Sequence, residues 1–220
     1  TGGLQRAAAG ISERAMSRAA RYLSHPQVQI DPAVPVPNWG LSLPGRARTE
    51  ALAAAGWLSG TTRIVSSGER KAIETAEILA KSLDLDGEVR EAMHENDRSA
   101  TGFLPPDEFE RVATQFFAKP DESIRGWERA MDAQARIVGE VEAVLAEADA
   151  GDVLFVGHGG VGTLLYCHYA DVPISRTHDQ PPGGGGNYLT LSLPEKRMLH
   201  PWRPLEFPPE SILPISTAIA

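Results

Sequence analysis

The segment DVLFVGHGGVGTLLYCHYA, residues 152–170, constrains the fold more than any other part of the sequence. Its first part, residues 152–158, is an apolar run that ends in a histidine, and glycines then open a second apolar run over residues 159–170. A strand without polar alternation is typical of a parallel sheet that helices cover on both faces. The segment therefore predicts a buried strand followed by a helix, as in an α/β fold.

The rest of the chain repeats this alternation of strand and helix. Short β-branched or alternating runs predict strands over residues 20–25, 61–67, 87–93, 187–193 and 197–202. Apolar residues at helical spacing predict helices over residues 42–58, 69–83, 107–117 and 123–149. Proline and glycine mark loops at residues 31–40 and 181–186. We therefore expect a mainly parallel sheet in one layered α/β domain.

The ends of the chain differ from this domain in composition. We expect residues 1–18 to form an N-terminal extension, natural or added for expression, and residues 19–205 to form the domain. Residues 206–220 are a proline-rich tail that could pack on a second copy of the chain, so a homodimer is one expected assembly.

Composition narrows the classes of partner. The formal net charge of −8 argues against nucleic acid or an anionic membrane, because both are bound through basic surface. No apolar run approaches the length of a membrane span, which is about 18 residues. The single cysteine, Cys167, excludes an internal disulfide and fits a reducing compartment, so we expect a cytoplasmic protein. Cys167 lies in an apolar helical run and is expected to be buried.

Two histidines follow predicted strands directly. His25 ends the first strand in RYLSHPQV, and His158 ends the strand over residues 152–158. Ligands of α/β sheets bind outside the carboxyl ends of the strands, so both imidazoles would reach one crevice if the strands are neighbours. Gly159 then opens a helix whose N–H groups could hold an anion. The alternative for His25 is a solvated loop residue.

Arg70 lies in the first turn of the helix predicted over residues 69–83. A cation is electrostatically disfavoured at a helix N-terminus. An anion bound between the guanidinium and the helix would explain an arginine at this position. An exposed arginine without a ligand is the alternative.

These segments resemble the histidine phosphatase superfamily, which has the phosphoglycerate-mutase-like fold. The segment SSGERKAIETAEILA, residues 66–80, is similar to the family's Ser-Pro-x-x-Arg-Ala-x-x-Thr-Ala-Glu, with Arg70 taken as the arginine. The resemblance spans residues 20–195 and implies a three-layer αβα sandwich. The other similar segments are SHP (24–26), LSLPGRARTEAL (41–52), MHEND (93–97), VGHGGV (157–162) and GGNYLTLSL (185–193).

The resemblance implies a phosphatase that acts on a small phosphorylated compound. His25 would attack phosphorus and carry the phosphoryl group, and Glu95 would be the general acid, with Glu91 as an alternative. Arg70, His158 and Gly159 would bind the phosphoryl oxygens. The scheme needs no metal and no cofactor.

The first motif departs from the family's Arg-His-Gly. Ser24 replaces the arginine and Pro26 the glycine, so a cation and a backbone N–H are lost beside the nucleophile. Ser24 could still bind phosphate as a neutral donor, and Arg98 is the candidate for the missing charge. A mutase-type phosphotransferase and a phospho-ligand-binding protein with weakened catalysis remain alternatives. A zinc hydrolase is disfavoured because the other histidines form no compact ligand motif.

Overall fold

The computed structural model describes residues 18–147 and 150–209. Of the expected N-terminal extension only Arg18 is described, and of the tail only residues 206–209; the rest of both lies outside the described residues. No described helix is long and apolar enough to cross a membrane. The strands are β1 (Arg18–Ser24), β2 (Thr61–Ser67), β3 (Gly87–Arg90), β4 (Asp152–Gly157), β5 (Asn187–Leu193) and β6 (Arg197–Pro204). The helices are α1 (Leu43–Ala55), α2 (Arg70–Leu83), α3 (Pro106–Ala118), α4 (Ala130–Glu147) and α5 (Gly159–Tyr169).

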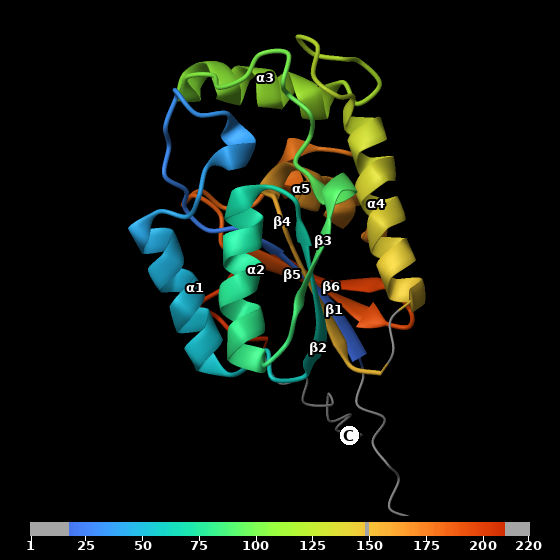
Figure 1. Ribbon diagram of the computed structural model, residues 1–220. Coiled ribbons are helices and arrows are strands. Elements are labelled where there is room, and N and C mark those ends of the chain that lie inside the picture. Colours follow the sequence, from blue (N-terminus) through green and yellow to red (C-terminus); the bar gives the residue numbers. More distant parts are fainter. Residues whose placement is uncertain (1–17, 148–149, 210–220) are drawn as a thin grey trace, which may run out of the picture.

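The strands form one mostly parallel sheet in the order β3-β2-β4-β1-β5-β6, which confirms the expected fold class (Figure 1). β1 and β4 are parallel neighbours, and so are β4 with β2 and β2 with β3. β5 runs antiparallel to both β1 and β6. In the register of β1 and β4, Ser24 pairs with Gly157. The residues that follow these strands, His25 and His158, therefore leave the sheet side by side.

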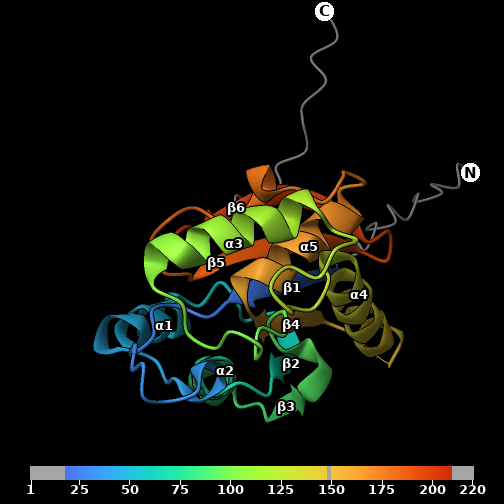
Figure 2. The same cartoon turned by 90° about the horizontal axis from the view of Figure 1, so that it is seen from above.

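Helices cover both faces of the sheet and make three layers. α1 and α2 pack on one face, and α4 and α5 on the other, while α3 lies across the end of the sheet (Figure 2). Each face has its own apolar core. Leu52, Leu79 and Leu154 belong to the core under α1 and α2, and Ile137, Phe155 and Leu164 to the core under α4 and α5. Cys167 is buried in α5, as expected.

The chain departs from the expected elements before α4. The helix expected over residues 123–149 begins only at Ala130. Arg125 and Gly126 have φ values of 54° and 82°, a left-handed conformation that no α-helix contains. The loop that results buries Trp127, whose indole N–H donates to Thr101 Oγ1 at 2.8 Å. The strand expected over residues 87–93 likewise ends at Arg90 and continues as a 3-10 turn.

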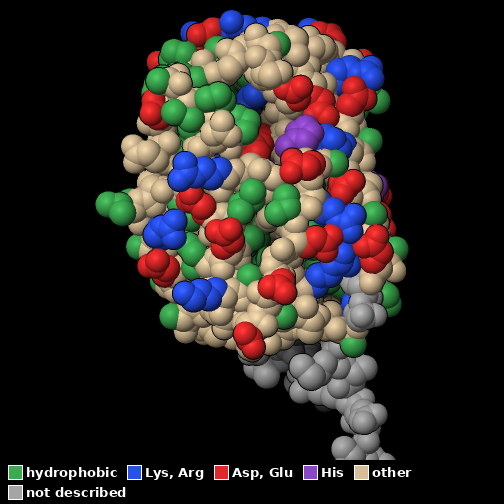
Figure 3. All heavy atoms as spheres, viewed as in Figure 1, with side chains coloured by type: hydrophobic (Ala, Val, Ile, Leu, Met, Phe, Trp, Pro, Cys, Tyr) green, Lys and Arg blue, Asp and Glu red, His purple; other side chains and the backbone are tan. Residues whose placement is uncertain are grey.

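Charged side chains of both signs are interspersed over the face of the molecule drawn in Figure 3. The net negative charge does not gather there into one acidic patch.

Candidate active site

The two strand-end histidines meet at the carboxyl end of the sheet. The ring centroids of His25 and His158 are 5.3 Å apart, with the rings inclined at 71°. The His25 N–H donates to the carbonyl of Gly157 at 2.9 Å, which extends the β1–β4 ladder to the histidine itself. The register of two neighbouring strands thus brings the two imidazoles together.

The tautomer of His25 follows from its hydrogen bond. Its Nδ1 lies 2.8 Å from the carbonyl oxygen of Pro26, which can only accept, so Nδ1 carries the proton. Nε2 is then unprotonated, and it has no hydrogen-bond partner among the described residues. Burial and the nearby charge of Lys71 lower the pKa of His25 from 6.5 to about 4. The imidazole is therefore neutral at pH 7, with a free lone pair on Nε2.

A glycine loop packs against the backbone of His25. Gly185 has a φ of 83°, and a side chain there would come within 2.1 Å of the His25 carbonyl oxygen. The same oxygen accepts from the N–H of Gly186 at 3.0 Å. The glycines of the loop over residues 181–186 thus permit a close approach that fixes the nucleophile candidate.

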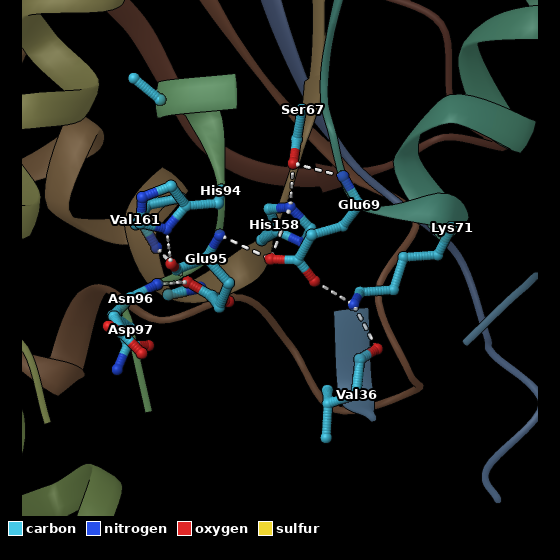
Figure 4. A network of polar contacts seen from close by, with 12 residues as sticks. Val36, Ser67, Glu69, Lys71, His94, Glu95, Asn96, Asp97, His158 and Val161 are labelled. Atoms are coloured by element: carbon cyan, nitrogen blue, oxygen red, sulfur yellow. Dashed lines mark hydrogen bonds and ion pairs between the residues drawn. The ribbon is translucent and has the colours of Figure 1, made fainter. Parts of the chain in front are cut away.

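His158 is fully buried and joins a polar network (Figure 4). Its Nε2 lies 2.8 Å from Ser67 Oγ and 3.5 Å from Glu69 Oε1. Its Nδ1 has no partner in the part of the chain that the structure describes. Burial lowers the pKa of His158 to about 3, so this ring is also neutral at pH 7.

Glu69 and Lys71 form a buried ion pair in the same network, and Lys71 Nζ also donates to the carbonyl of Val36 at 3.0 Å. Burial alone would raise the pKa of Glu69, but His158, Lys71 and the N–H of Glu95 together lower it to about 2. Lys71 is thus a cation held beside the two histidines, with Glu69 as its counter-ion.

The structure does not bring Arg70 to this site. Its side chain is 64% exposed, and its Nε donates to Glu74 one turn along α2 at 2.8 Å. The neighbouring Lys71 is buried instead and pairs with Glu69, whose carboxylate lies 3.5 Å from His158. A signal for this was present in the sequence, because Ala72, Thr75 and Ala76 match the Ala-x-x-Thr-Ala of the motif and the residue before them is Lys71.

Glu95 lies at the N-terminus of α5. Its carboxylate accepts from the N–H groups of Gly160 at 3.0 Å and Val161 at 2.9 Å, and its own N–H donates to Glu69 Oε1 at 2.9 Å. These bonds connect the acid candidate to the helix that follows His158. Glu91 does not line the cavity that holds His25 and Glu95, which is described below.

Arg136 of α4 holds the loop that carries Glu95. Its guanidinium donates to the carbonyls of Ala92 at 2.7 Å and His94 at 3.0 Å, and it pairs with Glu128. No local pattern predicts this role, because Arg136 is more than 40 residues from the carbonyls that it binds.

Ser24 does not reach the site as a direct phosphate ligand. It is fully buried, and its hydroxyl lies 2.7 Å from Gln180 Oε1 and 3.2 Å from the Asn187 carbonyl. The same hydroxyl accepts from the Asn187 N–H at 3.1 Å. The hydroxyl is therefore used inside the protein.

A cavity of about 810 Å³ opens over His25. Glu95, Gly159 and Gln180 line it, together with Arg98. The Arg98 guanidinium lies 4.9 Å from the ring centroid of Phe109, and no described residue forms an ion pair with it. A second cavity of about 910 Å³ shares Glu95, Asn96 and Arg98 with the first. The Nδ2 of Asn96 is buried without a partner among the described residues.

No three His, Cys, Asp or Glu side chains of the described residues lie together in a way that could hold a metal ion.

Several solved structures share the fold of this chain. A mycobacterial glucosyl-3-phosphoglycerate phosphatase with inorganic phosphate is 22% identical, with a TM-score of 0.69 over 87% of this chain and 100% of that chain. Bacillus stearothermophilus YhfR is 19% identical, with a TM-score of 0.69 over 84% and 95%. A phosphoserine phosphatase from Entamoeba histolytica is 13% identical, with a TM-score of 0.65 over 83% and 94%. None of the curated proteins compared with the chain matches it.

The family model of the histidine phosphatase superfamily (branch 1) matches residues 34–188. The match contains Lys71, Glu95 and His158, and it begins after the unusual Ser24-His25-Pro26. It covers most of the chain, and the fold agrees with it. The chain therefore belongs to the histidine phosphatase superfamily.

Proposed function

We propose that the protein hydrolyses a phosphate monoester through a phosphohistidine on His25. The observation that carries this proposal is the His25 Nε2: unprotonated, without a partner among the described residues, and beside His158 at the mouth of a cavity. A neutral imidazole nitrogen is a competent nucleophile near pH 7 without a separate base.

The reaction would proceed in two displacements. His25 Nε2 forms a bond to phosphorus while the phosphorus–oxygen bond to the leaving group breaks, and a protonated Glu95 gives its proton to the leaving oxygen. Glu95 then takes a proton from water, whose oxygen attacks phosphorus while the phosphorus–nitrogen bond breaks. Inorganic phosphate leaves, and His25 is neutral again. Glu95 lines the same cavity as His25, which this double role requires.

The phosphoryl group would be held by fewer charges than in the family's pattern. Lys71 supplies the cation that was expected from Arg70, but Glu69 already pairs with it. Arg98 and the N–H of Gly159 are the remaining groups of the cavity for this task. The next two N–H groups of α5 already donate to the Glu95 carboxylate. We therefore expect slow hydrolysis. This charge balance also favours a second candidate, a phospho-ligand-binding protein with weakened catalysis.

The cavity walls favour an organic monoester over a mutase substrate. Val28, Ile30 and Phe109 provide apolar surface for the body of the ester. A mutase must hold a second anionic group, and Arg176 in the cavity wall already pairs with Glu110. Arg98 alone is left for that task among the cavity's described arginines.

The test is hydrolysis of p-nitrophenyl phosphate by the wild type, His25→Asn and the control His168→Asn, whose histidine is exposed on α5. We expect activity in the wild type and the control, and none in His25→Asn. Equal turnover in His25→Asn would contradict the mechanism. No turnover across a panel of phosphate esters, with vanadate still bound, would favour the binding protein.

A further inference from the structure

The loss of the first-motif arginine leaves one question about the phosphate pocket: which donor stands beside His25 in its place. Ser24 cannot be that donor, because its hydroxyl is buried and engaged by Gln180 and Asn187. The partner it holds, Gln180, does line the cavity with His25. Ser24 therefore acts on the cavity through Gln180.

The amide of Gln180 has a defined orientation. Its Oε1 lies 2.7 Å from Ser24 Oγ and accepts from Asn187 Nδ2 at 3.1 Å. With the Asn187 amide as the structure places it, a reversed Gln180 amide would set its Nε2 against the Asn187 Nδ2, donor against donor. Nε2 is consequently turned away from this pair, and no described residue accepts a hydrogen bond from it.

The Nε2 of Gln180 lies against the opening of α5. A β-carbon placed on Gly159 would be 2.1 Å from Nε2, so the amide rests directly on the glycine that follows His158. Gly159 and Gln180 both line the cavity over His25. A phosphoryl group on His25 would thus find an oriented neutral donor next to Gly159. The N–H groups of Gly160 and Val161 donate to the Glu95 carboxylate instead.

We propose that Gln180 is a substrate-binding residue that donates its Nε2–H to a phosphoryl oxygen, and that Ser24 and Asn187 are the positioning residues that aim it. The proposal rests on the proposed function, because it takes the cavity to be a phosphate site. It also accounts for Ser24. This serine cannot supply the charge of the arginine that it replaces, but it orients the Gln180 amide that would bind the phosphoryl group instead. One neutral donor in place of a bidentate guanidinium agrees with a slow enzyme.

The test measures binding of orthovanadate and of inorganic phosphate, with the folded state of each variant checked by circular dichroism. Gln180→Leu removes the donor and should weaken vanadate binding about 10- to 100-fold, the range for a hydrogen bond to a charged group. Gln180→Glu points an anion at the phosphoryl oxygens and should weaken it further. Gln27→Glu is the matched control, because it puts the same charge on the same cavity wall, and its loss should be much smaller.

A spectroscopic readout separates donation from a merely structural role. The side-chain ¹⁵N resonance of Gln180, assigned by its absence in Gln180→Leu, should move when phosphate is added to the wild type. Ser24→Ala should keep a smaller shift and bind vanadate less tightly.

The proposal is overturned if Gln180→Leu binds vanadate within about twofold of the wild type, if the resonance does not move at saturating phosphate, or if the wild type binds neither anion. Binding that depends on Gln180 in a protein without hydrolytic activity would support Gln180 and refute the hydrolysis, so the two proposals fail separately.

Discussion

Replacing Lys71 by methionine tests which cation of α2 belongs to the site. The variant keeps most of the stem's volume but leaves the Glu69 carboxylate buried without its counter-ion. Removing one partner of a buried ion pair costs about 3–5 kcal/mol. The pKa of Glu69 is lowered to about 2, with His158 as the first lowering cause and Lys71 as the second, so only part of that shift belongs to Lys71. We therefore expect a loss of about 3 kcal/mol in the free energy of unfolding at pH 7.

Urea denaturation measures this loss, and the chain offers a matched control one residue away. Arg70→Met breaks only the exposed pair with Glu74, which contributes about 0.3–0.5 kcal/mol. The double variant Glu69→Gln/Lys71→Met should be more stable than Lys71→Met alone, because the buried charge is gone.

The same comparison has a defined pH dependence. The pKa of Glu69 is lowered on folding, so its contribution to stability is present above about pH 4.5 and is lost as the pH falls toward about 2. The gap between the wild type and Lys71→Met should therefore narrow as the pH is lowered from about 5 to about 3. Equal losses in Lys71→Met and Arg70→Met, or a gap that does not change with pH, would refute the assignment of Lys71 to the buried site.

Three further predictions concern catalysis. Glu95→Gln should lower kcat for p-nitrophenyl phosphate by about 10²- to 10⁴-fold, while Glu91→Gln, on the neighbouring cavity, should change it little; the reverse order would make Glu91 the acid. Because burial lowers the pKa of His25 to about 4, kcat/KM should not be reduced by protonation of His25 above about pH 5, and it should decrease at lower pH. A decrease with a midpoint near pH 6.5 that is lost only in His25 variants would show that the pKa of the nucleophile is not lowered. Arg136→Leu frees the carbonyls of the Glu95 loop and should lower kcat about tenfold or more with KM little changed, whereas Arg129→Leu, which breaks an exposed pair, should leave kcat near the wild-type value.

The parts of the fold that the sequence predicts well are those decided by local pattern. The run over residues 152–157 has no polar alternation, and the structure places it as β4 with neighbours on both sides. The start of α4 escaped prediction because Trp127 suits an apolar helical stripe, while the left-handed Arg125 and Gly126 before it end any helix. Burial of an indole in a loop satisfies the same hydrophobic pattern as burial in a helix.

The candidate site likewise contains features that the sequence predicts and features that it does not. The pairing of His25 with His158 could be anticipated because both follow strands that the fold makes neighbours. The choice between Arg70 and Lys71 depends on the register of the motif, because Ala72 and Thr75 match it only when Lys71 takes the place of the arginine. One step along a helix turns a side chain by about 100°, so an error of one residue places the wrong cation in the site. Gln180 was missed because nothing local marks it, and its role comes from Ser24, more than 150 residues earlier in the chain.

The most direct test of the central claim is to trap the phosphoryl group on the protein. Wild type and Glu95→Gln are mixed with a labelled aryl phosphate, quenched in alkali and digested, and the labelled peptide is sequenced by mass spectrometry. The mechanism predicts an alkali-stable, acid-labile label on His25, with more label in Glu95→Gln if release of the phosphoryl group to water is the step that is slowed. Hydrolysis that proceeds with no label on His25, or a label of the same amount in His25→Asn, would contradict it.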